Sequence, residues 1–179
     1  MHRRDLIKFI AAATGCAFVG SVRAAPAPHR PFSAHELLML DEIAETILPR
    51  TDTPGAKDAA VGAFIARYSA ACYEPVQLRS LHEGIGTLDA QMKAKAGTSF
   101  LRASPAQRQL LLTGIDLQAR KHALEHSSAV PHYFTLMKQL TLFGFFTSEA
   151  GSTRVLRYRP VPGKYRGCVP YRKGEAFWA

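Results

Sequence analysis

The side chains of this sequence whose spacing is best suited to metal binding are His122 and His126, four positions apart. On a helix this spacing places both imidazoles on one face, where they could bind zinc. The sequence offers no obvious third ligand beside them, so two solvated side chains are the simpler interpretation. A stand-alone periplasmic metal-binding protein or enzyme that uses this pair is the alternative to the function developed below.

Side chains arranged for acid–base or nucleophilic catalysis are not apparent. Asp52 and Asp58 flank a Pro-Gly turn, and turn and capping roles explain both carboxylates. The serines lack the glycine-flanked setting of a catalytic nucleophile. The sequence contains no glycine-rich phosphate loop, no His-Glu-x-x-His zinc motif and no Cys-x-x-Cys-His haem motif. We therefore expect no catalytic residue, no cofactor site and no metal site in this chain.

Residues 1–27 have the composition of an export signal. Arg3 and Arg4 precede an apolar pair and Lys8, and an uncharged stretch over 9–22 then leads to a Val-Arg-Ala cleavage site ending at Ala24. This order is similar to that of the twin-arginine signal, whose translocase exports folded proteins; an ordinary secretory signal is the alternative. The stretch is too short and too weakly apolar for a membrane-spanning helix. We expect a periplasmic protein.

Two cysteines, Cys72 and Cys168, would survive cleavage of the signal. In an oxidising periplasm two such thiols are more often paired than free. A bridge between them would tie the C-terminal tail to the second predicted helix. Spacing alone leaves both the paired and the free state open.

The charge of the chain points to an acidic partner or a membrane face. Its 179 residues are enough for one domain with a buried core, and the formal net charge is +9. Cleavage after Ala24 would remove three net positive charges and leave about +6, which favours an acidic partner or membrane face. No Lys/Arg run follows one predicted helix face and no nucleic-acid-binding signature is present, so we expect no nucleic acid as a partner.

Apolar periodicity predicts helices through most of the mature chain. Ser33 and Glu36 form a capping box that begins a helix over 34–48, and Ser104 caps a helix over 105–124. Further helices are predicted over 58–72, 74–95 and 130–146. Gly84 and Gly86 weaken the third helix by roughly 1 kcal/mol each relative to alanine. We predict an all-α fold, a small bundle of about five helices with an extended C-terminal tail rich in proline, glycine and aromatic residues.

Two regions near the C-terminus are suited to contact with another protein. The helix over 130–146 is apolar nearly all round, which fits either a central core helix or one docked on a partner. The tail over 158–179 combines aromatic and basic residues of the kind enriched in interface cores. The candidate contact residues are Phe143, Phe145, Phe146, Tyr158, Tyr165, Tyr171 and Trp178.

Taken together, these patterns divide the chain into a signal over 1–27, a helical domain over 28–157 and a tail over 158–179.

Four stretches together carry a likeness to a known family. They are the twin-arginine leader, residues 40–49 (Leu-Asp-Glu-Ile-Ala-Glu-Thr-Ile-Leu-Pro) with 51–56 (Thr-Asp-Thr-Pro-Gly-Ala), residues 142–149 (Leu-Phe-Gly-Phe-Phe-Thr-Ser-Glu), and residues 158–165 (Tyr-Arg-Pro-Val-Pro-Gly-Lys-Tyr) leading to Trp178. In this order they resemble the gluconate 2-dehydrogenase subunit 3 family, the small subunits of membrane-associated flavin-dependent sugar and sugar-acid dehydrogenases. The likeness spans residues 33–178, with little in 74–128.

The resemblance implies a place in a larger enzyme. A large subunit would hold FAD and oxidise the substrate, and a cytochrome c subunit with haem c would pass electrons to the membrane quinone pool. This chain would bind the large subunit, assist its maturation and take it through the twin-arginine translocase to the periplasmic face of the inner membrane. The family supplies no catalytic residues. A stand-alone helical ligand-binding domain is a third interpretation, and the substrate and the presence of a cytochrome stay open.

Overall fold

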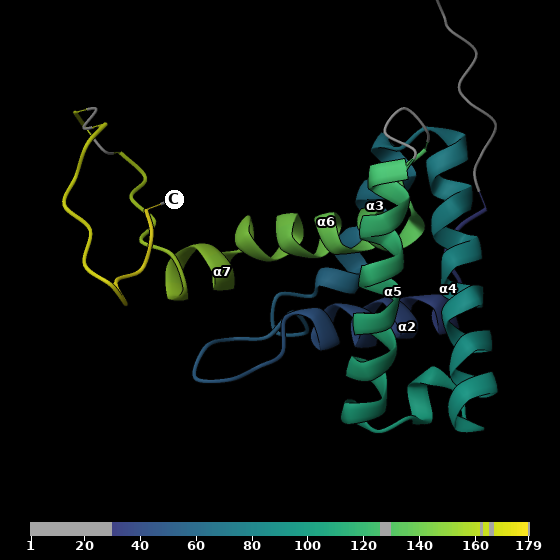
Figure 1. Cartoon of the computed structure of the whole chain (residues 1–179). Helices are drawn as coiled ribbons and strands as arrows, with labels where there is room; N and C mark the ends of the chain where they lie inside the picture. Colours follow the sequence, from purple (N-terminus) through teal and green to yellow (C-terminus); the bar gives the residue numbers. More distant parts are fainter. Residues whose placement is uncertain (1–29, 126–129, 162, 165–166, 179) are drawn as a thin grey trace, which may run out of the picture. The chain divides into compact units, whose positions relative to one another are not determined.

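The computed structural model describes residues 30–125, 130–161, 163–164 and 167–178, and these residues are helical for most of their length (Figure 1). Its helices are α2 (Ala34–Ile47), α3 (Val61–Cys72), α4 (Pro75–Ala96), α5 (Pro105–Glu125), α6 (Tyr133–Phe146) and α7 (Glu149–Arg154), with a 3-10 turn η1 (Phe100–Arg102) between α4 and α5. The described residues form no strand, so the predicted all-α class is confirmed, with five long helices and a short sixth. The predicted signal, with Arg3 and Arg4, lies outside the described residues.

The helices begin where the sequence places capping side chains. The Ser33 hydroxyl accepts a hydrogen bond from the Glu36 N–H at 3.2 Å, and the Glu36 carboxylate accepts one from the Ser33 N–H at 2.8 Å. The same exchange joins Ser104 and Gln107 at the start of α5, at 3.3 and 2.9 Å. Each pair satisfies backbone donors that an α-helix leaves open at its first turn. The predicted starts of both helices are confirmed.

Two helix starts differ from the prediction. The second helix was expected from Asp58 but begins at Val61, because Ala60 has a left-handed backbone with φ 50° and cannot continue a helix toward its N-terminal side. The fifth helix begins at Tyr133 rather than at 130, after the His132 ring accepts a hydrogen bond from the Phe134 N–H at 3.2 Å.

A further helix, α7, follows Ser148, where apolar periodicity stops. The Ser148 hydroxyl caps it by accepting a hydrogen bond from the Gly151 N–H at 3.0 Å. Its six residues are too few to show a helical period, so only the cap marks it in the sequence.

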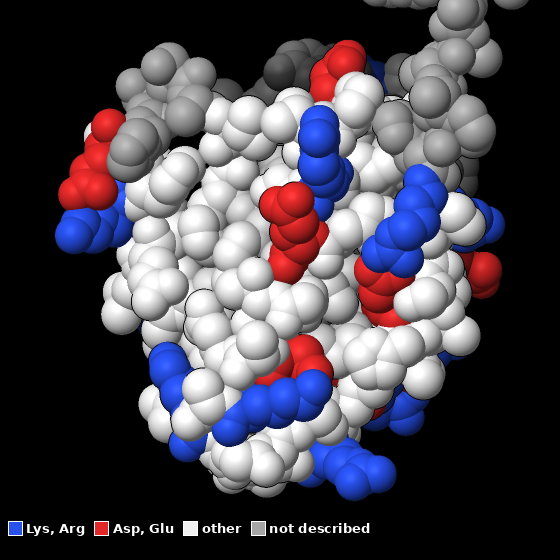
Figure 2. All heavy atoms as spheres, turned by 90° about the vertical axis from the view of Figure 1, so that its right-hand side faces the viewer, with Lys and Arg blue, Asp and Glu red and all other residues white. Residues whose placement is uncertain are grey.

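Charged side chains on the helices are mixed in sign. On the face drawn in Figure 2, basic and acidic side chains lie beside one another rather than in separate patches. Several form ion pairs: Lys93 with Asp89 at 2.7 Å on α4, and both Arg120 and Lys138 with Asp116, at 2.7 and 2.8 Å. On this face the helical part of the chain therefore presents no large patch of one sign.

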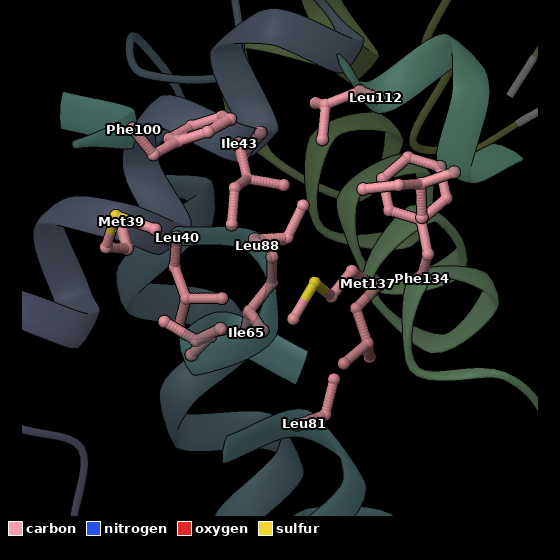
Figure 3. Close-up of a cluster of buried hydrophobic side chains, with 14 of the residues drawn as sticks. Met39, Leu40, Ile43, Ile65, Leu81, Leu88, Phe100, Leu112, Phe134 and Met137 are labelled. Atoms are coloured by element: carbon pink, nitrogen blue, oxygen red, sulfur yellow. The ribbon is translucent and has the colours of Figure 1, made fainter. Parts of the chain in front are cut away.

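Helix α6 lies at the centre of the core and packs against α2, α3, α4, α5 and α7. Figure 3 shows its Phe134 and Met137 among side chains from α2, α3, α4, η1 and α5. The labelled members, all buried, are Met39, Leu40, Ile43, Ile65, Leu81, Leu88, Phe100 and Leu112. The nearly uniform apolar character of this helix is thus explained by contacts on most of its sides.

Two glycines allow helices to approach more closely than any other residue would. A Cβ at Gly84 of α4 would lie 2.5 Å from the ring of Tyr133, the first residue of α6. A Cβ at Gly62 of α3 would lie 2.8 Å from the backbone nitrogen of Asp41 in α2. Gly84 therefore has a packing role, whereas the sequence indicated only that it weakens the helix. Gly86 faces open space.

Candidate partner-binding surfaces

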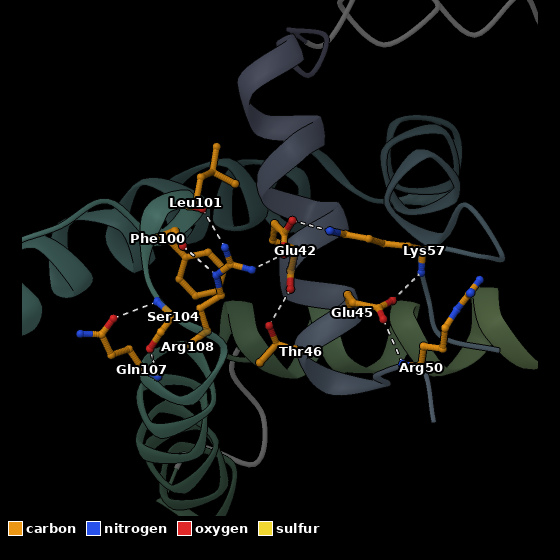
Figure 4. Close-up of polar contacts among 10 residues, drawn as sticks. All are labelled: Glu42, Glu45, Thr46, Arg50, Lys57, Phe100, Leu101, Ser104, Gln107 and Arg108. Carbon is orange, nitrogen blue, oxygen red and sulfur yellow. Dashed lines mark hydrogen bonds and ion pairs between the residues drawn. The ribbon is translucent and has the colours of Figure 1, made fainter. Parts of the chain in front are cut away.

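The turn after α2 is held in place by a carboxylate from the preceding helix (Figure 4). Glu45 accepts hydrogen bonds from the N–H groups of Arg50 and Lys57, both at 2.9 Å. A Cβ at Gly55 would lie 2.6 Å from the same carboxylate, so only glycine fits there. The Thr-Pro-Gly-Ala stretch is therefore a rigid turn fixed to the last turn of α2.

Asp58 has the turn role that the sequence predicted. Its carboxylate accepts hydrogen bonds from the Arg50 guanidinium, through Nε at 2.8 Å and also through Nη2, and from the Gly55 N–H at 2.8 Å. These bonds, with Arg50 as the larger contributor, hold the pKa of Asp58 below its usual value. The side chain is thus a structural anion that needs no catalytic role to explain it.

The turn and α7 line an open cleft, although they are far apart in the sequence. One part of it, about 490 Å³, is lined by Arg50, Thr51, Asp52, Thr53, Pro54, Asp58 and Arg154. A neighbouring part of about 340 Å³ adds Ser148 and Glu149 to Asp58 and Arg154. Two of the stretches that suggested the family, around residues 51–56 and 142–149, therefore meet at one place. The sequence alone gave no signal that they would.

The C-terminal half of α6 exposes aromatic side chains over α3. Phe143 and Phe146 are 46% and 37% exposed, whereas Phe145, also expected at an interface, is only 3% exposed and belongs to the core. The Phe143 ring contacts Phe64 and Tyr68 of α3, with centroids 5.6 and 5.3 Å apart. We call Phe64, Tyr68, Phe143 and Phe146 the aromatic edge. It combines two exposed rings of α6 with two half-buried rings of α3.

The two ends of the segment over 157–178 meet. The Arg157 N–H donates to the Phe177 carbonyl at 2.7 Å, and Arg157 and Trp178 form a parallel bridge. The Arg157 guanidinium lies 5.4 Å from the centre of the Trp178 ring and 3.6 Å from the Glu175 carboxylate. Of the predicted contact residues here, Tyr158, Tyr171 and Trp178 are exposed, and Tyr165 lies outside the described residues. We call residues 157–178 the closed loop.

A third exposed apolar surface was missed by sequence reasoning. Leu110, Leu117 and Leu124 of α5 follow one another at intervals of seven, and all are 63–86% exposed. The opposite face of the same helix buries Leu111, Leu112 and Ile115. The interval of seven was the signal that could have found the exposed stripe, because it keeps three leucines on one face.

The histidine pair expected as the alternative site is only partly visible. His122 lies beside His132, with ring centroids 5.8 Å apart, and His126 is outside the described residues. Burial and the neighbouring His122 lower the pKa of His132. Among the residues that the structure describes, no three His, Cys, Asp or Glu side chains are grouped to hold a metal ion.

Both remaining cysteines lie at the surface. Cys72, the last residue of α3, and Cys168 in the closed loop are exposed and free in the structure. The bridge between them stays a prediction, which the mass of the oxidised periplasmic protein would test.

These observations define a class: a small helical protein with exposed apolar and aromatic surfaces and, among the described residues, no helix with the length and apolarity needed to cross a membrane. The family model described as Gluconate 2-dehydrogenase subunit 3 matches residues 34–163, from α2 through α7 into the closed loop. The chain belongs to this family. No curated protein and no solved structure matches the chain.

Proposed function

We propose that this chain is the non-catalytic small subunit of a periplasmic FAD-dependent dehydrogenase that oxidises a sugar or sugar acid. It binds the FAD-containing large subunit, assists the maturation of that subunit and accompanies it through the twin-arginine translocase. Membership of the gluconate 2-dehydrogenase subunit 3 family supports the role of an accessory subunit. FAD belongs to the large subunit; where the complex includes a cytochrome c subunit, haem c belongs to that subunit.

The observation that carries the proposal is the position of Phe143 and Phe146. Both lie on α6, the central helix of the core, yet both rings are exposed. Because α6 is held on most sides, the backbone that carries these rings is ordered before a partner arrives, so binding costs no backbone entropy there. Exposed aromatic clusters of this kind mark protein contact sites in soluble proteins.

Co-purification with the flavoprotein subunit tests the role of the aromatic edge. We expect Phe143→Gln with Phe146→Gln to abolish co-purification of the two subunits. The matched control is Leu38→Gln with Val76→Gln, two exposed apolar residues of α2 and α4 that are not members of the edge. Circular dichroism and thermal unfolding establish that both variants stay folded. Equal co-purification of the two variants would contradict the assignment of this surface.

Export tests the escort role separately. Replacing Arg3 and Arg4 by lysine keeps the charge but removes the paired arginines, so we expect both subunits to stay in the cytoplasm. The control is Arg23→Lys in the same segment, which keeps the pair and should leave export unchanged. Continued export of the flavoprotein subunit beside the double variant would exclude the escort role. Metal analysis of the purified chain tests the His122/His126 alternative, which requires stoichiometric metal.

A further inference from the structure

Positive charge in this chain is concentrated in the closed loop. Residues 30–156 hold thirteen Lys and Arg against twelve Asp and Glu, so the helical part is almost neutral. Residues 157–178 hold six Lys and Arg, and Glu175 is their one acidic residue. The basic excess that remains after removal of the signal therefore belongs almost wholly to the loop.

The contacts within the loop bring its aromatic side chains together. Arg157 fixes Trp178 at the junction of the two ends, and the Tyr171 ring stacks on Phe177 with centroids 5.2 Å apart and planes 11° apart. All three rings remain exposed. Arg172 and Lys173, which follow Tyr171 in the sequence, are exposed as well. The loop thus presents aromatic rings and positive charges together.

We propose that the closed loop binds an acidic surface of the flavoprotein subunit. Its rings cover apolar atoms of that surface, while its basic side chains pair with carboxylates around them. The inference rests on the proposed function and adds the chemistry of the partner's surface. Charge complementarity carries it, because a loop with a large basic excess on a nearly neutral body is attracted to negative potential.

A protein surface fits this loop better than a membrane does. Segments that lie in a membrane surface are typically amphipathic helices with one apolar face, and the described residues of the loop form no helix. Three of its rings also have partners within the loop: Tyr171 stacks on Phe177, and the Arg157 guanidinium lies over the ring of Trp178. The family match ends within the loop, at residue 163.

Charge reversal in the loop provides the test. The loop variant Arg172→Glu with Lys173→Glu is compared with the control Arg79→Glu with Lys95→Glu on α4, which makes the same change in net charge at exposed positions. The Kd between the mature chain and the FAD-loaded flavoprotein subunit is measured at low and high NaCl. Because salt shortens the Debye length from about 10 Å at 0.1 M to about 3 Å at 1 M, wild-type binding should weaken at least roughly tenfold with salt.

The loop variant should bind at least roughly tenfold more weakly than wild type at low salt and show little further salt dependence. The control should stay within about threefold of wild type, since its charges lie on α4 and not in the closed loop. Equal weakening by both variants would mean that net charge alone matters, and would overturn the proposal. Unchanged, salt-independent binding of the loop variant would also overturn it, while leaving the subunit role intact. Failure of the wild-type chain to bind at all would instead remove the proposed function.

Trp178 gives a direct probe because it is the chain's single tryptophan. In a chain labelled with 5-fluorotryptophan, the ¹⁹F signal should shift on addition of the flavoprotein subunit and stay unchanged with phosphatidylglycerol vesicles. A shift with the vesicles and none with the flavoprotein would assign the loop to the membrane surface and contradict the proposal.

Discussion

Gly84 and Gly86 lie on the same helix, and substitution by alanine should have opposite effects at the two positions. At Gly86 a Cβ would meet no atom within 4 Å, so alanine should raise the free energy of unfolding by about 1 kcal/mol through helix propensity. At Gly84 the same gain is opposed by a 2.5 Å approach to two atoms of the Tyr133 ring. Overpacking of this kind costs about 1–3 kcal/mol.

The net expectation is that Gly84→Ala destabilises the protein by about 1 kcal/mol, which places the two variants about 2 kcal/mol apart. For a chain of this size that difference corresponds to roughly 4–8 °C in Tm. Urea unfolding followed by circular dichroism measures both values. Combining Gly84→Ala with Tyr133→Leu should recover part of the loss, because the smaller side chain leaves room for the new methyl group. Equal effects of alanine at the two glycines would refute the close approach of α4 to the start of α6.

Three further predictions concern the turn before α3 and the contact between α2 and α5. Ala60→Gly should raise the free energy of unfolding by about 1 kcal/mol in urea titrations, since φ is 50° there, whereas Ala59→Gly should not. Folding lowers the pKa of Asp58, so its ionised carboxylate should stabilise the protein fully above about pH 4 and lose that effect as the pH falls through the lowered pKa. Thermal unfolding at a series of pH values should therefore show Asp58→Asn to be less stable than wild type above about pH 4, and the difference should vanish at lower pH. Arg108→Met should cost about 2 kcal/mol in urea unfolding, because the guanidinium bonds a carboxylate of α2 and two carbonyls of η1.

Features set by local chemistry could be predicted from the sequence. The capping boxes at Ser33 and Ser104 and the apolar periodicity between them depend on residues three or four apart, so they fix the starts of α2 and α5. The composition of α6 predicted that it is covered on most sides, but left open whether by the core or by a partner; its contacts with five other helices show that the core covers it.

Features that depend on contacts between distant segments could not be predicted. The left-handed backbone at Ala60 is imposed on a residue that does not prefer it, and nothing in its identity signals the turn. The cleft that joins the 51–56 turn to α7 needs the whole core to bring its walls together. The meeting of Arg157 with Phe177 and Trp178 likewise joins the two ends of a long segment. Phe145 was expected at the surface with its neighbours, but one helical step separates a buried from an exposed position.

The central claim is that this chain works by binding a flavoprotein subunit. Its most direct test is size-exclusion chromatography with light scattering on the mature chain mixed with the FAD-loaded subunit, alongside a chain truncated after residue 156. We expect a stable complex for the full-length mature chain, and loss of that complex with retained helix content for the truncated chain. A mature chain that elutes alone as a monomer in the presence of the flavoprotein subunit, and oxidises a sugar or sugar acid without it, would contradict this account.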